Sequence, residues 1–198
     1  MIDQTAFFSL SYGLYIVGAT DGERRAACVA NTFQQVTSSP LQVSVALNKE
    51  NATTVAVRQA GRFTASCLSE RADMQLIGTF GFHTSTELDK FAHHASARDE
   101  AGMPYVAEQC CAWFSAKVVS ELDLGTHVLF LGEVQECAKV ADAAAPMTYA
   151  FYHQVKGGKT PPKASSYLGE EQPAGVPAES NGVEQPKVAW RCTICGHM

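Results

Sequence analysis

The chain is built from short stretches in which apolar and polar residues alternate, and this pattern restricts the fold more than any other feature. The clearest stretch places Leu41, Val43, Val45 and Leu47 on one face of a predicted strand. Strand-like segments also occupy residues 13–20, 24–30, 63–68, 112–122, 126–137 and 147–155. Asp21-Gly22, between the first two of these, is typical of a tight hairpin turn.

Predicted helices are few and brief. They cover residues 3–10, 52–60 and about 69–77, and a further one is expected after Thr84 and Glu87, which have the spacing of a capping box. Many strands at short spacing with few helices predict a mainly β fold. A closed or partly closed antiparallel barrel is favoured over a parallel α/β sheet, because closure removes exposed strand edges.

Composition excludes several classes of partner. Of the 198 residues, 46% are hydrophobic and 18% charged, as in an ordinary globular protein with one main domain. A net charge of −5 does not provide the clustered Lys and Arg that nucleic acid or an anionic membrane requires. The first residues match neither a secretory signal nor a membrane span, and seven scattered cysteines are typical of reduced thiols, so we expect a cytoplasmic protein.

The stretch from residue 29 to 54 is the candidate binding region. A polar run that includes Asn31, Thr32, Gln35 and Thr37 precedes the central strand, and these groups could hydrogen-bond a heterocycle. After the strand, Asn51 could cap a helix whose first N–H groups, with Lys49 and Thr53 nearby, could face a phosphate. Local chemistry alone favours ordinary turn and cap residues, since such clusters bound most strands.

Several ordered segments resemble the FMN-binding flavin reductase-like family, especially its forms fused to rubredoxin in anaerobic bacteria. They are ATDG, ANTFQQVTSSP, LNKENATT, FTASCLS, GTFGFHTSTELDKF, GTHVLFLGEV and YHQVKGGKTPPKASSY. The resemblance implies a split β-barrel and a homodimer with one FMN per subunit near the interface. It also implies NADH or NADPH as electron donor.

Site residues follow from matching positions in that family. The resemblance places Asn31, Thr32, Gln35, Val36 and Thr37 along the isoalloxazine ring, and Asn48, Lys49, Asn51 and Thr53 around the phosphate. Phe80, Ser85 and Lys90 match a second loop near the cofactor. His127, the candidate catalytic residue, matches a histidine near the nicotinamide or flavin in relatives, and a hydrogen-bonded histidine at a strand start is an equal alternative.

The resemblance implies an NAD(P)H:flavin oxidoreductase that passes electrons to a rubredoxin-type centre or a partner such as a flavodiiron protein. The chain has no GxGxxG in a strand-to-helix context, so we expect the nicotinamide to stack on the flavin. Two alternatives remain: an FMN-binding electron carrier without a nicotinamide site, and a cofactor-free dimeric interaction module.

The end of the chain predicts a separate segment. We expect the flavin reductase-like domain at residues 1–169, a flexible acidic linker at 170–187, and a rubredoxin-like segment at 188–198. Cys192 and Cys195 form one CxxCG knuckle, half of the four thiolates that a rubredoxin iron requires. Truncation is favoured over a degenerate domain, a redox dithiol or a half-site shared between chains, and we expect no iron bound by this chain alone.

Overall fold

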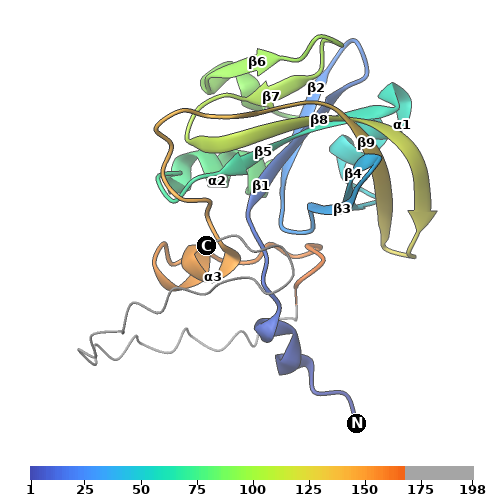
Figure 1. Cartoon of the computed structure of the whole chain (residues 1–198). Helices are drawn as coiled ribbons and strands as arrows, with labels where there is room; N and C mark the ends of the chain where they lie inside the picture. The colour runs from blue at the N-terminus through green and yellow to red at the C-terminus, as the bar shows by residue number, and fades with distance from the viewer. Residues whose placement is uncertain (168–198) are drawn as a thin grey trace.

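A computed structural model describes residues 1–167 of the chain, and one antiparallel sheet organises them (Figure 1). Its seven strands lie in the order β2-β1-β5-β8-β9-β4-β3. Their bounds are β1 Tyr15–Thr20, β2 Arg25–Ala30, β3 Gln34–Ser38, β4 Leu41–Asn48, β5 Arg62–Leu68, β8 Cys110–Asp123 and β9 His127–Lys139. A separate hairpin pairs β6 Ser96–Arg98 with β7 Pro104–Val106.

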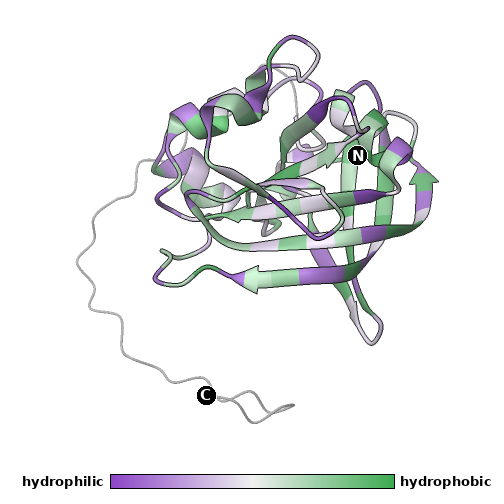
Figure 2. Cartoon of the chain, turned by 90° about the horizontal axis from the view of Figure 1, so that it is seen from above, coloured by the Kyte–Doolittle hydropathy of each residue, from purple (hydrophilic) through white to green (hydrophobic). Residues whose placement is uncertain are grey.

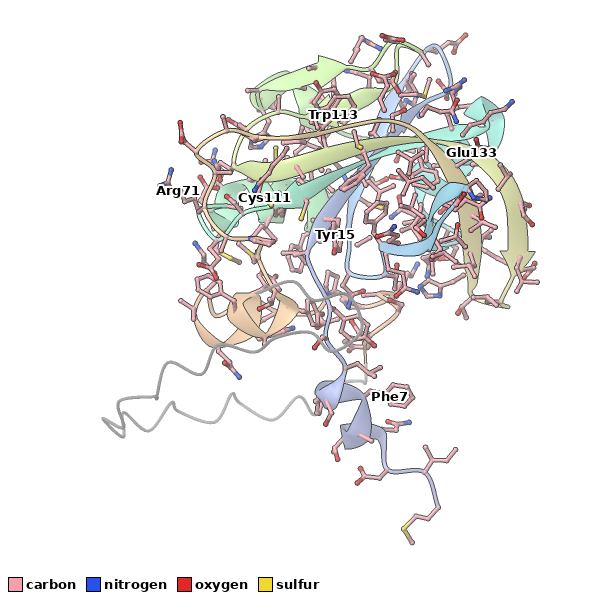
Figure 3. All side chains as sticks on the ribbon, in the orientation of Figure 1. Phe7, Tyr15, Arg71, Cys111, Trp113 and Glu133 are labelled. Atoms are coloured by element: carbon pink, nitrogen blue, oxygen red, sulfur yellow. The ribbon has the colours of Figure 1, made fainter. Side chains whose placement is uncertain are left out.

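Short helices surround the sheet. They are η1 Gln4–Ser9, α1 Ala52–Ala60, α2 Met74–Phe82, η2 Lys90–His93 and α3 Tyr149–Gln154. In Figure 1, α3 lies below the sheet and η1 projects away from the body, and the labelled Phe7 of η1 in Figure 3 has no sheet beside it. Among the described residues, no helix has the length and apolar character needed to cross a bilayer.

Two apolar clusters share the sheet. One is formed by inward-facing residues of the strands and by α1, with Val17, Val45, Phe63 and Phe130 fully buried. The other packs α2 and α3 against the opposite side of β1 and β2, around Ile16 and Phe80. Because β1 is covered on both faces, its residues 16–19 are all buried. Figure 2 shows green bands along the strands, alternating with white and purple ones.

The prediction of a mainly β, antiparallel fold with few helices is confirmed. The hairpin at Asp21-Gly22 forms, with Gly22 at a φ of 100° that favours glycine. The helix predicted at 52–60 is α1, capped by Asn51 and ended by Gly61 in the left-handed region. Barrel closure and the homodimer remain predictions, since β2 and β3 are the edge strands of the described sheet.

Three local predictions are wrong, each because a cap or a tertiary contact outweighs the pattern. Residues 147–155 form the helix α3 rather than a strand, because Thr148 caps it and Tyr152 is buried against the second cluster. The second helix begins at Met74, because Asp73 and not Ser69 caps it, and Gly78 and Gly81 lie within it. Thr84 and Glu87 begin no α-helix, and Asp89 instead caps η2.

The polar run before the central strand contains a strand of its own. Residues 34–38 form β3, which pairs with β4 and is exposed at every position. An edge strand with no buried face carries no alternation of apolar and polar residues, so its sequence resembles that of a loop.

Candidate functional site

A cavity of about 250 Å³ opens where β2, β4, the start of α1 and the end of α2 meet. We call it the polar cavity. Its lining includes five of the predicted cofactor residues and the predicted catalytic histidine, namely Asn31, Thr32, Asn48, Asn51, Phe80 and His127. The remaining wall is a segment near the end of the described chain, residues 159–166, which we call the strap.

The start of α1 supplies the most distinctive polar group. The Asn51 side chain accepts a hydrogen bond from the Thr53 N–H at 2.9 Å, and the Thr54 hydroxyl donates to the Asn48 carbonyl at 2.7 Å. The Thr53 hydroxyl is fully buried and is the one buried side-chain nitrogen or oxygen among residues 1–167 without a hydrogen-bond partner of normal geometry, and the Cys28 thiol lies against it. A buried hydroxyl without a strong hydrogen bond costs free energy; Thr53 itself does not line the cavity, whereas its neighbours Asn51 and Ala52 do.

Asn31 and Thr32 lie just after β2. The Thr32 hydroxyl donates to the Ala46 carbonyl at 2.8 Å and accepts from the Ala46 N–H at 3.1 Å, so it ties the loop to β4. Asn31 is 7% exposed and contacts the strap: its amide donates to the Ser166 hydroxyl and its carbonyl accepts from Ser165. Both side chains therefore shape the cavity wall.

The strap is the part of the site to which the sequence interpretation assigned no residue. Its backbone is held by the Asn48 amide, which donates to the Lys163 carbonyl at 3.1 Å, and by the Tyr152 hydroxyl, which donates to the Lys159 carbonyl at 3.0 Å. Lys159 and Lys163 both line the cavity. The available signal is the segment YHQVKGGKTPPKASSY, which is one of the segments that resemble the family and which includes the strap.

His127 begins β9 and faces the same cavity. Burial lowers the pKa of its imidazole, and a hydrogen bond with the Lys163 backbone acts in the opposite direction. Its Nδ1 lies 2.9 Å from the Thr126 hydroxyl. The ring is therefore neutral at about pH 7 and fixed between β9 and the strap.

Five of the predicted ring and phosphate residues are absent from the cavity lining, among them the buried Thr53. Gln35, Val36 and Thr37 are on the exposed edge strand β3, and the Thr37 hydroxyl donates to the Pro40 carbonyl. The Lys49 ammonium is paired with Asp123 at 2.5 Å. The structure thus groups Asn51 and Thr53 at the helix start and separates them from Lys49.

Ser85 and Lys90 lie behind the cavity wall. Lys90 is 2% exposed, and its ammonium donates to the carbonyls of Ala27 at 2.7 Å and Phe80 at 3.1 Å. The Ser85 hydroxyl accepts from the Ala27 N–H at 3.1 Å. Burial lowers the pKa of Lys90. These two residues join β2 to α2 and so position Phe80, which does line the cavity.

No group of three or more potential metal-ligating side chains occurs among residues 1–167. Cys192 and Cys195, as well as the predicted linker and C-terminal segment, lie outside the described residues.

Comparison with known proteins gives concordant matches. The flavin reductase like domain matches residues 7–158. The chain is 44% identical to a ferric-chelate reductase (NAD(P)H) from Archaeoglobus fulgidus, covering 84% of this chain and 98% of that protein. It is 38% identical to a high molecular weight rubredoxin from Moorella thermoacetica, covering 100% of this chain and 82% of that one.

Solved structures share the fold. An FMN-binding protein from Thermus thermophilus with bound p-hydroxybenzaldehyde superposes with a TM-score of 0.62 at 22% identity, covering 68% of this chain and 75% of that one. The family match extends over most of the chain. The chain belongs to the flavin reductase-like family and is an NAD(P)H:flavin oxidoreductase.

Proposed function

We propose that the polar cavity binds FMN, with the phosphate at the start of α1 and the ring near Asn31 and the strap. The observation that carries this proposal is the fully buried Thr53 hydroxyl without a partner. Thr53 lies in the first turn of α1, where free N–H groups and the helix dipole favour an anion. Its neighbours Asn51 and Ala52 line the cavity. We assign the phosphate contact to Asn51 and Thr53 rather than to Lys49, which is paired with Asp123.

When bound, the flavin accepts a hydride from the reduced nicotinamide and passes the electrons on. The chain contributes binding and orientation. Asn31 and the strap supply hydrogen-bonding groups at the cavity wall, and the neutral imidazole of His127 supplies a donor or acceptor without a charge. The buried Lys90 cation lies behind that wall, where it favours negative charge in the cavity.

The size of the polar cavity supports a role for a second copy. At about 250 Å³, it is below the usual range of roughly 300–1,000 Å³ for ligand sites and cannot enclose a flavin and a nicotinamide together. The proposed homodimer would cover the rest of the ring. Light scattering on the purified chain should give about twice its mass of 21.3 kDa, and a monomer at micromolar concentration would contradict this part of the proposal.

We further propose that the electrons leave to a rubredoxin-type iron centre or a flavodiiron partner. The support is the match along the whole chain to a protein named high molecular weight rubredoxin, and the match to a ferric-chelate reductase. The five cysteines of the described residues are free thiols, which supports a reducing compartment, and we place the enzyme in the cytoplasm.

Thr53→Val tests the phosphate site. Valine has the same shape as threonine and lacks only the hydroxyl, so the variant should be as stable as the wild type or more stable. FMN affinity, measured by calorimetric titration, should fall about tenfold, the loss of a hydrogen bond to a charged group. Thr79→Val is the matched control, because its partly exposed hydroxyl bonds only within α2. Equal FMN affinity for both variants and wild type would exclude the assignment.

The activity is tested by adding NADH or NADPH anaerobically to the chain with FMN. Bleaching of the flavin absorption is expected with at least one nicotinamide. If neither bleaches it and a reduced protein donor does, the chain is an electron carrier without a nicotinamide site. A chain that takes up no FMN would instead be the cofactor-free interaction module.

A further inference from the structure

A continuous row of hydrogen bonds joins the polar cavity to His153 on α3. From the cavity outward, the Asn31 amide donates to the Ser166 hydroxyl at 3.0 Å, and Ser166 lies 3.1 Å from the Tyr149 hydroxyl. Tyr149 lies 2.5 Å from the Thr160 hydroxyl, and Thr160 lies 3.4 Å from His153 Nε2. Beyond Asn31, these groups come from the strap and α3, so two segments adjacent in sequence form the rest of the row.

The direction of the row is set at its outer end. His153 Nδ1 lies 2.8 Å from the Gly158 carbonyl, which only accepts, so Nδ1 carries the ring proton. In the neutral ring, Nε2 is then an acceptor. Thr160 must donate to Nε2, Tyr149 must donate to Thr160, and Ser166 must donate to Tyr149. Every hydroxyl proton therefore points from the cavity toward His153.

Local packing keeps His153 neutral and in reach of solvent. Burial lowers the pKa of the imidazole, and the bond with the Gly158 carbonyl acts in the opposite direction. The titratable groups packed on the ring are Tyr149 and Tyr152, from its own helix, with ring centroids 4.4 and 5.1 Å away. Gly158, and Thr160 of the strap, also contact the His153 ring. The Lys156 ammonium does not face this ring, because it lies over the ring of Phe151. His153 itself is partly exposed.

We propose that Ser166, Tyr149, Thr160 and His153 form a proton relay that takes a proton from a group bound in the polar cavity to His153. In one transfer, the bound group gives its proton to Ser166, Ser166 gives its own to Tyr149, Tyr149 to Thr160, and Thr160 to His153 Nε2. The net result is the transfer of one proton and of no electron. The charge of the bound group falls by one, and His153 becomes imidazolium.

The relay rests on the proposed function, which gives it a use. A reduced flavin loses a proton when its electrons pass to an acceptor that takes electrons alone. A neutral imidazole at the outer end, with three hydroxyls already pointing toward it, is arranged to receive that proton and release it to solvent.

The first experiment needs no flavin. Imidazole NMR of the full chain should show the Nδ1–H tautomer of His153. Thr160→Val removes the hydroxyl that donates to Nε2 of the neutral ring, so the Nε2 resonance of the neutral ring should shift in the variant while the Nδ1 resonance changes little. An Nε2–H tautomer, or an unchanged Nε2 resonance in Thr160→Val, would overturn the relay whether or not the chain binds FMN.

The second experiment breaks the middle of the row. Tyr149→Phe should slow oxidation of the FMN-loaded chain by an electron-only acceptor about tenfold or more and should remove the dependence of that rate on the His153 titration. Tyr12→Phe is the matched control, because it deletes a hydroxyl from a ring that packs edge-on against Tyr149, with ring centroids 6.1 Å apart, and that lies outside both the row and the cavity lining. Equal rates and equal pH profiles in the two variants would overturn the proposal. Failure of all chains, wild type included, to bind FMN would instead count against the proposed function.

Discussion

Two hollows on the sheet differ in size and chemistry, and the smaller one is the proposed site. The polar cavity has about 250 Å³, whereas an apolar groove on another part of the sheet has about 740 Å³. The groove is lined by aromatic and aliphatic side chains, by three thiols and by one charged residue, Lys139. The polar cavity collects a helix start, three asparagines and a neutral histidine, and Thr53, with its unpaired hydroxyl, comes directly after the lining residues Asn51 and Ala52. A ligand site combines a pocket with a few convergent polar groups, and the polar cavity has more of these groups than the apolar groove, which has Gln34, Gln35 and Lys139.

The largest expected effect is on the free energy of unfolding and concerns a side chain that lines the apolar groove. Phe33 lines the groove, is 6% exposed, and packs on Tyr15 and Phe114 with ring centroids 5.1 and 5.4 Å away. Phe33→Ala should lower the free energy of unfolding by about 3–5 kcal/mol, because it leaves a void in the core. Phe7→Ala, on the projecting η1, should change it by less than about 0.5 kcal/mol. Denaturant unfolding measures both, and equal losses would show that η1 is packed in solution.

The next effect should fall on the polar cavity alone. Asn31→Ala removes the hydrogen bonds to Ser165 and Ser166, so the strap loses its contact with β2. FMN affinity should fall about tenfold, while the free energy of unfolding falls by only about 1 kcal/mol. Calorimetric titration and thermal unfolding measure the pair. A loss of stability without a loss of affinity would place the flavin elsewhere.

A smaller effect should appear as a dependence of stability on pH. Folding lowers the pKa of His127 and His153, so below the unfolded pKa of about 6.5 the unfolded chain binds more protons than the folded chain. Stability should therefore decrease as the pH falls from about 7 through the folded pKa values. The double variant His127→Gln, His153→Gln should show a smaller decrease of its unfolding midpoint over this pH range. His93 is exposed, so His93→Gln should show the same decrease as the wild type.

The smallest effect concerns the thiols of the apolar groove. Burial, with the neighbouring Cys111 thiol as a further cause, raises the pKa of Cys67 to about 12. Cys67 should therefore react slowly with iodoacetamide at about pH 8, while the exposed Cys137 reacts quickly. Peptide mapping by mass spectrometry measures the order in which the two thiols react. FMN affinity should be the same after Cys137 is modified, and a large loss would link the groove to the flavin.

Strands and helices with a buried face could be predicted because their contacts leave a period in the sequence. The strand of Leu41 to Leu47 and the helix capped by Asn51 form as expected. β3 could not be predicted because all its residues are exposed, and α3 was mistaken for a strand because its aromatic residues also favour strands.

The same limit applies to the candidate site. Local rules place Asn51 and Thr53 at a helix start, but nothing in the sequence shows that Lys49 pairs with Asp123 or that Lys90 is buried behind Phe80. The strap was missed because its contacts join residues far apart in the chain, such as Asn31 with Ser166 and Asn48 with Lys163. Residue patterns report contacts between residues that are close in the sequence. The contacts of the strap with Asn31 and Asn48 are not of that kind.

The position of the strap also has a consequence for biosynthesis. Asn31, Asn48 and the start of α1 leave the ribosome more than one hundred residues before the segment that completes the cavity. A nascent chain that has folded its sheet therefore presents the proposed phosphate site before the strap is present. A flavin that binds there does not need to enter through a finished enclosure, because the strap is synthesised after the rest of the cavity wall.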